Sequence, residues 1–372
     1  MSNLAPVLAF NFLVFGGGGA PSYNEIAIEK NVMYFQRTLA ALGEKPDRAS
    51  IWFANGEDGR KTVRYVEDGK NKFKAPSIPG LSGSATLGNL RTAIAEEADR
   101  KNPLFFYFTG HGLHNRENEN NNAMILWNER NASVQQFGSM LDQFSPDKPF
   151  VTVMVQCYSG SFANLIYRGG QIQRGLAPHD RCGFFATVKE RPSVGCTPEV
   201  DEADYRDYSS SFFAGLSGIS RTGQRVENAD YDRDQRVSFR EAHAFAKIDE
   251  QAEDLPVSTL EVWLQERLSN RDRALALAQP MKTLLKTARP EQVQVVRRLA
   301  QRIGYDLGRS HRMNLTQSQR EKLNRKPLYE IYAERIEMEL LNIVAEQKVR
   351  DSQDEGAIAT LEKLLHCEGR SL

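Results

Sequence analysis

Two stretches of the sequence decide the fold, 104-LFFYFTGHG-112 and 150-FVTVMVQCYSG-160. Short runs that are rich in aromatic and β-branched residues and bounded by Pro and Gly are typical of strands buried on both faces. Such strands belong to parallel sheets that helices cover. Ligands of open α/β sheets bind beyond the carboxyl ends of the strands, where these two runs place His111 and Cys157. The sequence therefore predicts an α/β fold with a histidine and a cysteine at its site.

The rest of residues 1–250 alternates between strand-like and helix-like segments. Apolar runs predict further strands at 7–15, 51–54 and 182–188, and apolar residues at helical spacing predict helices at 24–42, 86–100, 133–143 and 209–218. Residues 59–84 are rich in Gly, Lys and Pro and show no period, so we expect a long loop or lid there. The alternation is typical of a doubly wound sheet.

The C-terminal part, residues 251–372, has a different character. From about Asp254 onward, segments with apolar residues at helical spacing follow one another, and Pro280, Pro290 and Pro327 stand where helices start. We therefore expect a domain at 1–250 and a helical region at 251–372 that docks on it, recruits a partner protein or gates the site. The stretch 289–325 is locally basic, but a solvated helix face explains it better than nucleic acid.

Charge and cysteine content limit the classes of function. Lys plus Arg and Asp plus Glu number 48 each, so no overall field favours nucleic acid or an anionic membrane. The apolar run 4–15 is too short to span a bilayer and follows no basic residue, so a first core strand explains it better than a leader. Four scattered cysteines favour a reducing, cytoplasmic setting, although a Cys182–Cys196 bridge and a missing leader stay open.

The chemistry that His111 and Cys157 offer is nucleophilic. A cysteine attacks as its thiolate, and a nearby histidine removes the thiol proton and later protonates the leaving amine. Backbone N–H groups stabilise the oxyanion, and Gly112 leaves room for a carbonyl to approach them. A cysteine at a strand end is often only a small core residue. The pairing with a histidine in a matching strand-then-glycine context favours catalysis.

The motifs Thr109-Gly110-His111-Gly112 and Gln156-Cys157-Tyr158-Ser159-Gly160 resemble the signatures of the caspase-like cysteine peptidases, clan CD. The likeness is to the legumain-like and bacterial caspase-like members and covers roughly residues 7–246. It implies a three-layer α/β/α sandwich, a hydrolase activity and proteolysis. By carry-over, His111 is the general acid and base, Cys157 the nucleophile, and the amides of Gly112 and Cys157 the oxyanion hole. Asn24 orients the histidine.

The resemblance also bears on the residue preceding the scissile bond, P1. Residues 25–28 carry no base where legumains have one, so asparagine specificity is not carried over. Asp207 and Asp204 stand where the family has a pocket acid, which favours Arg or Lys at P1. Solvated loop carboxylates are an equal alternative.

A second pattern, an EF-hand-like loop, lies at 230–241. Its predicted calcium ligands are Asp230, Asp232, Asp234, the backbone carbonyl of Arg236, and Glu241. Clustered carboxylates repel one another unless a cation neutralises them. Gln235 replaces the glycine of the sharp turn, so we expect strain and weak affinity. The alternative is an acidic turn that leads into a helix.

The sequence thus favours a calcium-binding cysteine endopeptidase that cleaves protein or peptide substrates. Two alternatives remain. One is a caspase-like scaffold or calcium-dependent adaptor without turnover, and the other is a transpeptidase that uses the same two residues.

Overall fold

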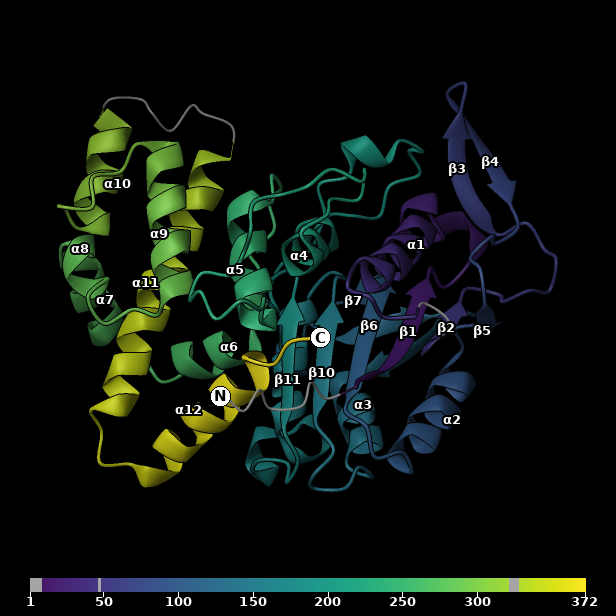
Figure 1. The fold of residues 1–372 in the computed structure, drawn as a ribbon, viewed down its shortest axis with the longest axis horizontal. Coiled ribbons are helices and arrows are strands. Elements are labelled where there is room, and N and C mark those ends of the chain that lie inside the picture. Colours follow the sequence, from purple (N-terminus) through teal and green to yellow (C-terminus); the bar gives the residue numbers. More distant parts are fainter. Residues whose placement is uncertain (1–8, 46–47, 321–327) are drawn as a thin grey trace.

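The computed structural model describes residues 9–45, 48–320 and 328–372, and a seven-stranded sheet forms the centre of this part of the chain (Figure 1). In spatial order its strands are β12 (Val257–Ser258), β11 (Arg181–Phe185), β10 (Phe150–Met154), β6 (Leu104–Gly110), β1 (Asn11–Gly17), β2 (Ala49–Phe53) and β5 (Leu81–Gly83). All neighbours pair in parallel except β12, which runs antiparallel to β11. The carboxyl ends of the parallel strands point to the top of Figure 1.

Helices cover both faces of the sheet. On one face lie α1 (Ile26–Ala41), α4 (Tyr208–Ser217) and α5 (Phe239–Asp249), packed on alternate strand residues such as Phe12, Val14 and Phe105. On the other face lie α2 (Leu87–Ala98) and α3 (Val134–Leu141), packed on the intervening residues, such as Leu13 and Phe106. Every residue of β6 and β10 is buried. The predicted α/β class with a mostly parallel, helix-covered sheet is confirmed.

Several element ends differ from those expected. The first strand begins at Asn11, and residues 7 and 8 of the predicted strand lie outside the described residues. Thr86 caps α2, because its hydroxyl accepts the Asn89 N–H at 3.2 Å.

The stretch 59–84 is not entirely the loop that the sequence predicted. It contains the antiparallel hairpin of β3 (Val63–Glu67) and β4 (Lys70–Lys74), and also β5. This hairpin projects at the upper right of Figure 1. A second small sheet joins β7 (Gly112–Leu113), β8 (Ala123–Leu126) and β9 (Arg130–Ser133).

The C-terminal region is helical, as expected, but it is also joined to the sheet. Its helices are α6 (Thr259–Gln265), α7 (Asn270–Ala278), α8 (Met281–Leu284), α9 (Pro290–Ile303), α10 (His311–Arg320), α11 (Tyr329–Arg350) and α12 (Glu355–Glu368). The proposed start at Pro327 lies outside the described residues. The region supplies the edge strand β12, and the side chain of Lys247 on α5 forms buried ion pairs with Glu261 on α6 and Glu339 on α11. The described helices of the C-terminal region are therefore packed into the same body as the sheet.

A disulfide adds a covalent link between the two parts. Cys182 in β11 is bonded to Cys367 in α12, 185 residues away in the sequence, while Cys157 and Cys196 are free thiols. The alternative Cys182–Cys196 bridge is therefore absent, because Cys182 has another partner. Both bonded residues are buried in the core on the α1 side of the sheet. The bridge thus fastens the last helix to a central strand.

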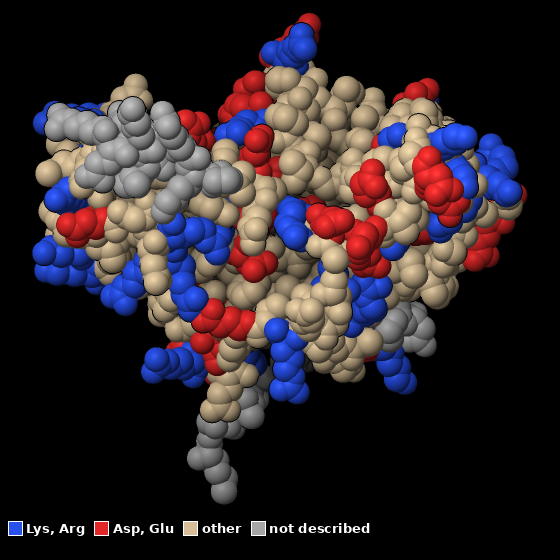
Figure 2. Space-filling model, turned by 90° about the horizontal axis from the view of Figure 1, so that it is seen from above, with Lys and Arg blue, Asp and Glu red and all other residues tan. Residues whose placement is uncertain are grey.

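Surface charge is mixed over the face that looks along the sheet from its carboxyl end. Figure 2 shows acidic and basic side chains interspersed there, without a single-sign patch that covers the face. Among the described residues, no helix combines the length and the apolar character that crossing a membrane requires.

Candidate active site

His111 and Cys157 lie at the same edge of the sheet because their strands are neighbours. β6 and β10 pair in parallel, with Phe108 opposite Met154, so the segments that follow them leave the sheet side by side. The backbones touch there: a Cβ atom added to Gly112 would lie 2.0 Å from the Cys157 carbonyl oxygen. Only glycine allows this approach at position 112. The expected meeting of the two segments is thus present in the structure.

The chain turns sharply just after Cys157. Tyr158 has φ 60, in the left-handed region that side chains rarely adopt, and a 3-10 helix, Ser159–Ile166, follows. The Tyr158 N–H donates to the Arg191 carbonyl at 2.9 Å, and its ring stacks on His114 with centroids 4.5 Å apart. Such strained residues persist where the surroundings hold them, and they cluster at functional sites. The turn places the thiol beyond the end of β10.

The Cys157 thiol is half-buried and lies in a cradle of backbone N–H groups. The Ser193 N–H donates to its sulfur at 3.3 Å. Burial raises the pKa of Cys157, and the charge of Asp254 adds to the rise, whereas the N–H groups of Ser193, Cys157 and Gly112 lower it. The net pKa is above the ordinary value, so the resting group is a neutral thiol. It therefore needs a base to remove its proton.

A carboxylate holds the imidazole of His111. Its Nε2 atom lies 2.9 Å from Glu25 Oε2, and the other Glu25 oxygen pairs with Arg64 of β3 at 2.6 Å. Burial would raise the pKa of Glu25, but the hydrogen bonds from His111 and Arg64 outweigh it and hold the pKa below the ordinary value. An ionised carboxylate accepts a proton donor, so Nε2 carries the hydrogen and Nδ1 keeps the lone pair. Nδ1 is then the basic atom of this ring.

The expected role of Asn24 falls to its neighbour. The Asn24 side chain accepts the Gly18 N–H at 2.9 Å and donates to the Thr62 carbonyl at 3.2 Å, so it ties two backbone segments together. Glu25 is the residue that forms a hydrogen bond with His111, and the Tyr23 ring packs edge-on against the imidazole with centroids 5.5 Å apart. From the sequence alone, Glu25 was assigned no contact with the histidine. This position was considered only because legumains have a basic residue in this region and this chain does not. An acid directly before an apolar helix that starts at the sheet edge was the available signal.

A cavity of about 430 Å³ opens next to the loop between β11 and α4. Val194 and Gly195 of this loop line the cavity, and the preceding residue, Ser193, contacts the Cys157 sulfur. Both predicted pocket acids line it as well. Its lining residues are Val194, Gly195, Thr197, Glu199, Asp204, Tyr205, Arg206, Asp207, Gln251, Ala252, Glu253 and Leu328.

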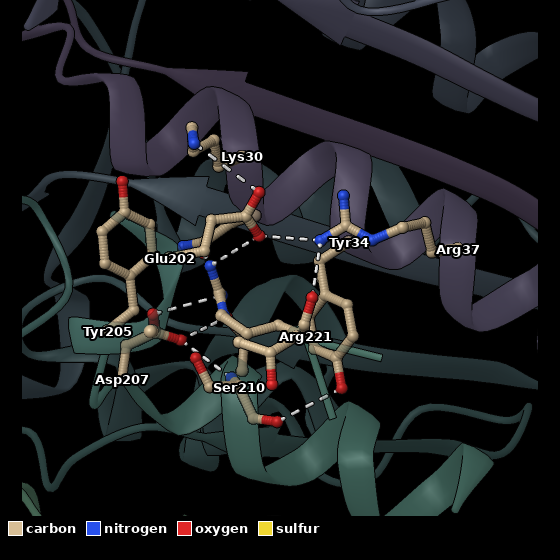
Figure 3. A network of polar contacts seen from close by, with 12 residues as sticks. Lys30, Tyr34, Arg37, Glu202, Tyr205, Asp207, Ser210 and Arg221 are labelled. Carbon is tan, nitrogen blue, oxygen red and sulfur yellow. Dashed lines mark hydrogen bonds and ion pairs between the residues drawn. The ribbon is translucent and has the colours of Figure 1, made fainter. Parts of the chain in front are cut away.

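The two pocket acids differ in environment. Asp204 is exposed. Asp207 is buried, caps α4 through the Ser210 N–H at 2.9 Å, and has its second oxygen 3.4 Å from the guanidinium of Arg221 (Figure 3). Arg221 is also 3.7 Å from Glu202, so it neutralises part of the acidic cluster. Asp207 is therefore a paired structural acid, and Asp204 is the freer charge at the cavity.

The predicted calcium loop brings three of its carboxylates together. Oxygens of Asp230, Asp232 and Asp234 lie within 4.8 Å of one another. Gln235 has φ 72, so it adopts the left-handed turn that glycine usually provides. This is the strained conformation expected for a non-glycine residue at that place.

Of the other two predicted ligands, the Glu241 side chain is engaged elsewhere. Glu241 is buried, and its oxygens accept the N–H groups of Tyr231 at 2.7 Å and of Ser238 at 2.9 Å in the capping box of α5. The Arg236 N–H donates to Asp234 at 2.9 Å, and its guanidinium lies 3.8 Å from the same carboxylate. Three of the predicted ligands therefore lie together, while the Glu241 carboxylate is used by backbone N–H groups.

Comparisons with known proteins add little to this geometry. No family model matches the chain, and neither does any curated protein. Among solved structures, the chain is similar to protein GSU0716 from Geobacter sulfurreducens, with 10% identity and a TM-score of 0.36 over 63% of this chain and 88% of that chain. A similarity this low says nothing about the residues of the site.

Proposed function

We propose that the chain is a cysteine endopeptidase of the caspase-like kind, with Cys157 as nucleophile and His111 as general acid and base. The observation that supports this most is the contact between His111 and Glu25. It fixes the basic nitrogen of the imidazole at the sheet edge where the Cys157 thiol lies in a cradle of N–H groups. A merely structural cysteine needs neither the oriented base nor the cradle.

The proposed reaction uses groups already at this edge. His111 Nδ1 takes the thiol proton, and the Cys157 sulfur attacks the carbonyl carbon of the scissile bond. The N–H groups of Gly112 and Cys157 donate to the oxyanion. When the C–N bond breaks, the amine leaves with the proton from His111. Water then attacks the thioester, His111 takes its proton, and the acid is released with the thiol restored.

The cavity beside the loop between β11 and α4 is the proposed P1 pocket. Its exposed acids Glu199, Asp204 and Glu253 outnumber its one base, Arg206. This balance favours an Arg or Lys side chain before the scissile bond. Because Arg221 pairs with Asp207, the proposed preference rests mainly on Asp204.

Two further proposals concern the setting. Calcium is proposed at the Asp230 loop, where three carboxylates would supply oxygen ligands. The Cys182–Cys367 bridge favours an oxidising compartment over the reducing, cytoplasmic one that the cysteine count favours.

The test is hydrolysis of a fluorogenic peptide library with varied P1 residues, by wild type and Cys157→Ala, with calcium or with chelator. We expect turnover of Arg and Lys substrates by wild type and none by the variant. Equal turnover by Cys157→Ala would refute the proposal. Joined peptides in place of hydrolysed ones would identify the transpeptidase, and binding without turnover by wild type would favour the scaffold.

A further inference from the structure

A second free thiol lies beside the His111 imidazole and has no part in the reaction above. Ligand atoms of Glu25, His111 and Cys196 all lie within 4.8 Å of one another. The three residues come from separate segments: Glu25 precedes α1, His111 follows β6, and Cys196 belongs to the loop between β11 and α4. Among the described residues, the Cys196 thiol also makes a long contact of 3.6 Å with the Gly110 carbonyl.

This donor set suits zinc. Zn²⁺ binds thiolate sulfur, imidazole nitrogen and carboxylate oxygen in a tetrahedron, with bonds of about 2.0–2.3 Å. The ligand atoms of such a site are roughly 3.3–3.8 Å apart, so the cluster needs to tighten by about 1.5 Å at most and the Glu25–His111 pair to open slightly. Calcium and magnesium prefer all-oxygen sites.

We propose that Glu25, His111 and Cys196 form a zinc site that switches the enzyme off by occupying its base. The inhibition rests on the proposed peptidase function, but the metal binding does not. Three protein ligands leave the fourth position to water. The His111 side chain is 23% exposed, so a hydrated ion reaches it from solvent.

Charge and protons balance on binding. Cys196 loses its proton to solvent and binds as the thiolate, and Glu25 binds as the carboxylate, so two negative charges offset those of Zn²⁺. Arg64 keeps its pair with the second Glu25 oxygen. His111 gives up the Nε2 hydrogen that faces Glu25, and a proton from solvent occupies Nδ1 instead. The nitrogen that would accept the Cys157 proton is then blocked.

Cobalt provides a test that does not depend on activity. Co²⁺ replaces Zn²⁺ in such sites, and a thiolate ligand gives a charge-transfer absorption in the near ultraviolet, which oxygen ligands do not. The Asp230 loop therefore stays silent, and Cys182 and Cys367 are already bonded to each other. We expect the band in wild type and in Cys157→Ser, and its loss in Cys196→Ser. Zn²⁺ should remove the band by competition.

To measure the inhibition, the peptide turnover of each variant with Zn²⁺ is compared with the turnover of the same variant in chelator. We expect micromolar Zn²⁺ to lower wild-type turnover at least about tenfold and that of Cys196→Ser by much less, since the variant has lost the thiolate ligand. A band that survives in Cys196→Ser but disappears in Cys157→Ser would overturn the proposal, because the metal would then sit on the nucleophile. Absence of any band would overturn it too. A normal band on a chain that hydrolyses no peptide would leave the zinc site standing and refute only the peptidase.

Discussion

The carboxylate of Asp254 accepts a hydrogen bond from the Ser193 hydroxyl at 2.8 Å and another from the Val194 N–H at 3.0 Å. The Ser193 N–H in turn donates to the Cys157 sulfur. On its other side, the Asp254 carbonyl accepts from the Arg335 guanidinium of α11 at 2.7 Å. A chain of direct contacts therefore joins the C-terminal helices to the thiol. This is the physical basis on which the helical region would influence the site.

Replacing Asp254 should change the reactivity of Cys157. Asp254→Asn keeps an acceptor for Ser193 but removes the charge that raises the pKa of the Cys157 thiol. We expect the pH profile of alkylation by iodoacetamide to move to lower pH, because the charge that opposes the thiolate is gone. The measurement is made in a Cys196→Ser background so that one free thiol is followed. Glu253→Gln, which removes a neighbouring exposed charge, should move the profile less, and equal shifts in both variants would contradict the direct effect.

Glu25 should matter for turnover more than for substrate binding. Glu25→Gln keeps the size of the side chain but no longer holds Nε2 as the protonated nitrogen. We expect kcat to fall about 10²-fold with KM little changed, the range for losing a correctly placed acid–base group. Glu129→Gln is the control, because Glu129 contacts the neighbouring Tyr23 hydroxyl at 3.1 Å. If both variants lose activity equally, Glu25 acts only through local packing.

Calcium should bind the Asp230 loop weakly. Three carboxylates without the bidentate glutamate correspond to a Kd of about 10⁻⁴–10⁻³ M. Asp232→Asn should weaken binding severalfold in calorimetric titration. Glu241→Gln should leave the calcium affinity nearly unchanged. It should weaken the N-terminal cap of α5 and so lower the free energy of unfolding by about 1 kcal/mol. Abolition of calcium binding in Glu241→Gln would instead show that Glu241 turns to the ion and completes the EF-hand.

The disulfide should contribute to stability because it closes a long loop. Replacing Cys182 and Cys367 together by Ala should lower the free energy of unfolding by about 2–4 kcal/mol in urea titrations. Reductant should lower the stability of wild type by a similar amount and leave the double variant unchanged. If wild type does not respond to reductant under conditions that break the bridge, the loop closure adds nothing to stability.

The sheet and the close approach of the segments that follow β6 and β10 could be predicted from the sequence, because both depend on local pattern. The runs that form β6 and β10 are apolar throughout, and their parallel pairing fixes where the next residues go. The hairpin of β3 and β4 could not be foreseen in the same way. The strand β4 (KNKFK) is mostly lysine and largely exposed, and β3 (VRYVE) has a single buried residue, so neither shows the alternation that marks a half-buried strand.

Partners that come from distant segments were also beyond the sequence. Cys182 and Cys367 are 185 residues apart, and nothing in their spacing distinguishes that pair from Cys182–Cys196. Asp207 was foreseen as a pocket acid, but Arg221, which neutralises it, enters from a separate loop. The choice between Asn24 and Glu25 depends on which of two adjacent side chains faces the sheet edge. Adjacent side chains point in different directions, and both Asn24 and Glu25 are buried, so burial alone does not show which of them faces His111.

Glu368 should make the stability of the chain depend on pH. Its side chain is 1% exposed and accepts the Leu260 N–H at 2.7 Å, and burial raises its pKa to about 8. A carboxyl group whose pKa is raised on folding stabilises the fold fully below the unfolded pKa, and this stability is lost as the pH rises through the folded value. We therefore expect the Tm of wild type to fall between pH 5 and pH 9.

Glu368→Gln keeps the hydrogen-bond acceptor without the charge, so its Tm should fall less over this range. The control is Glu362→Gln, which changes an exposed residue of the same helix and should behave like wild type. Parallel curves for wild type and Glu368→Gln would mean that Glu368 is not the group that titrates.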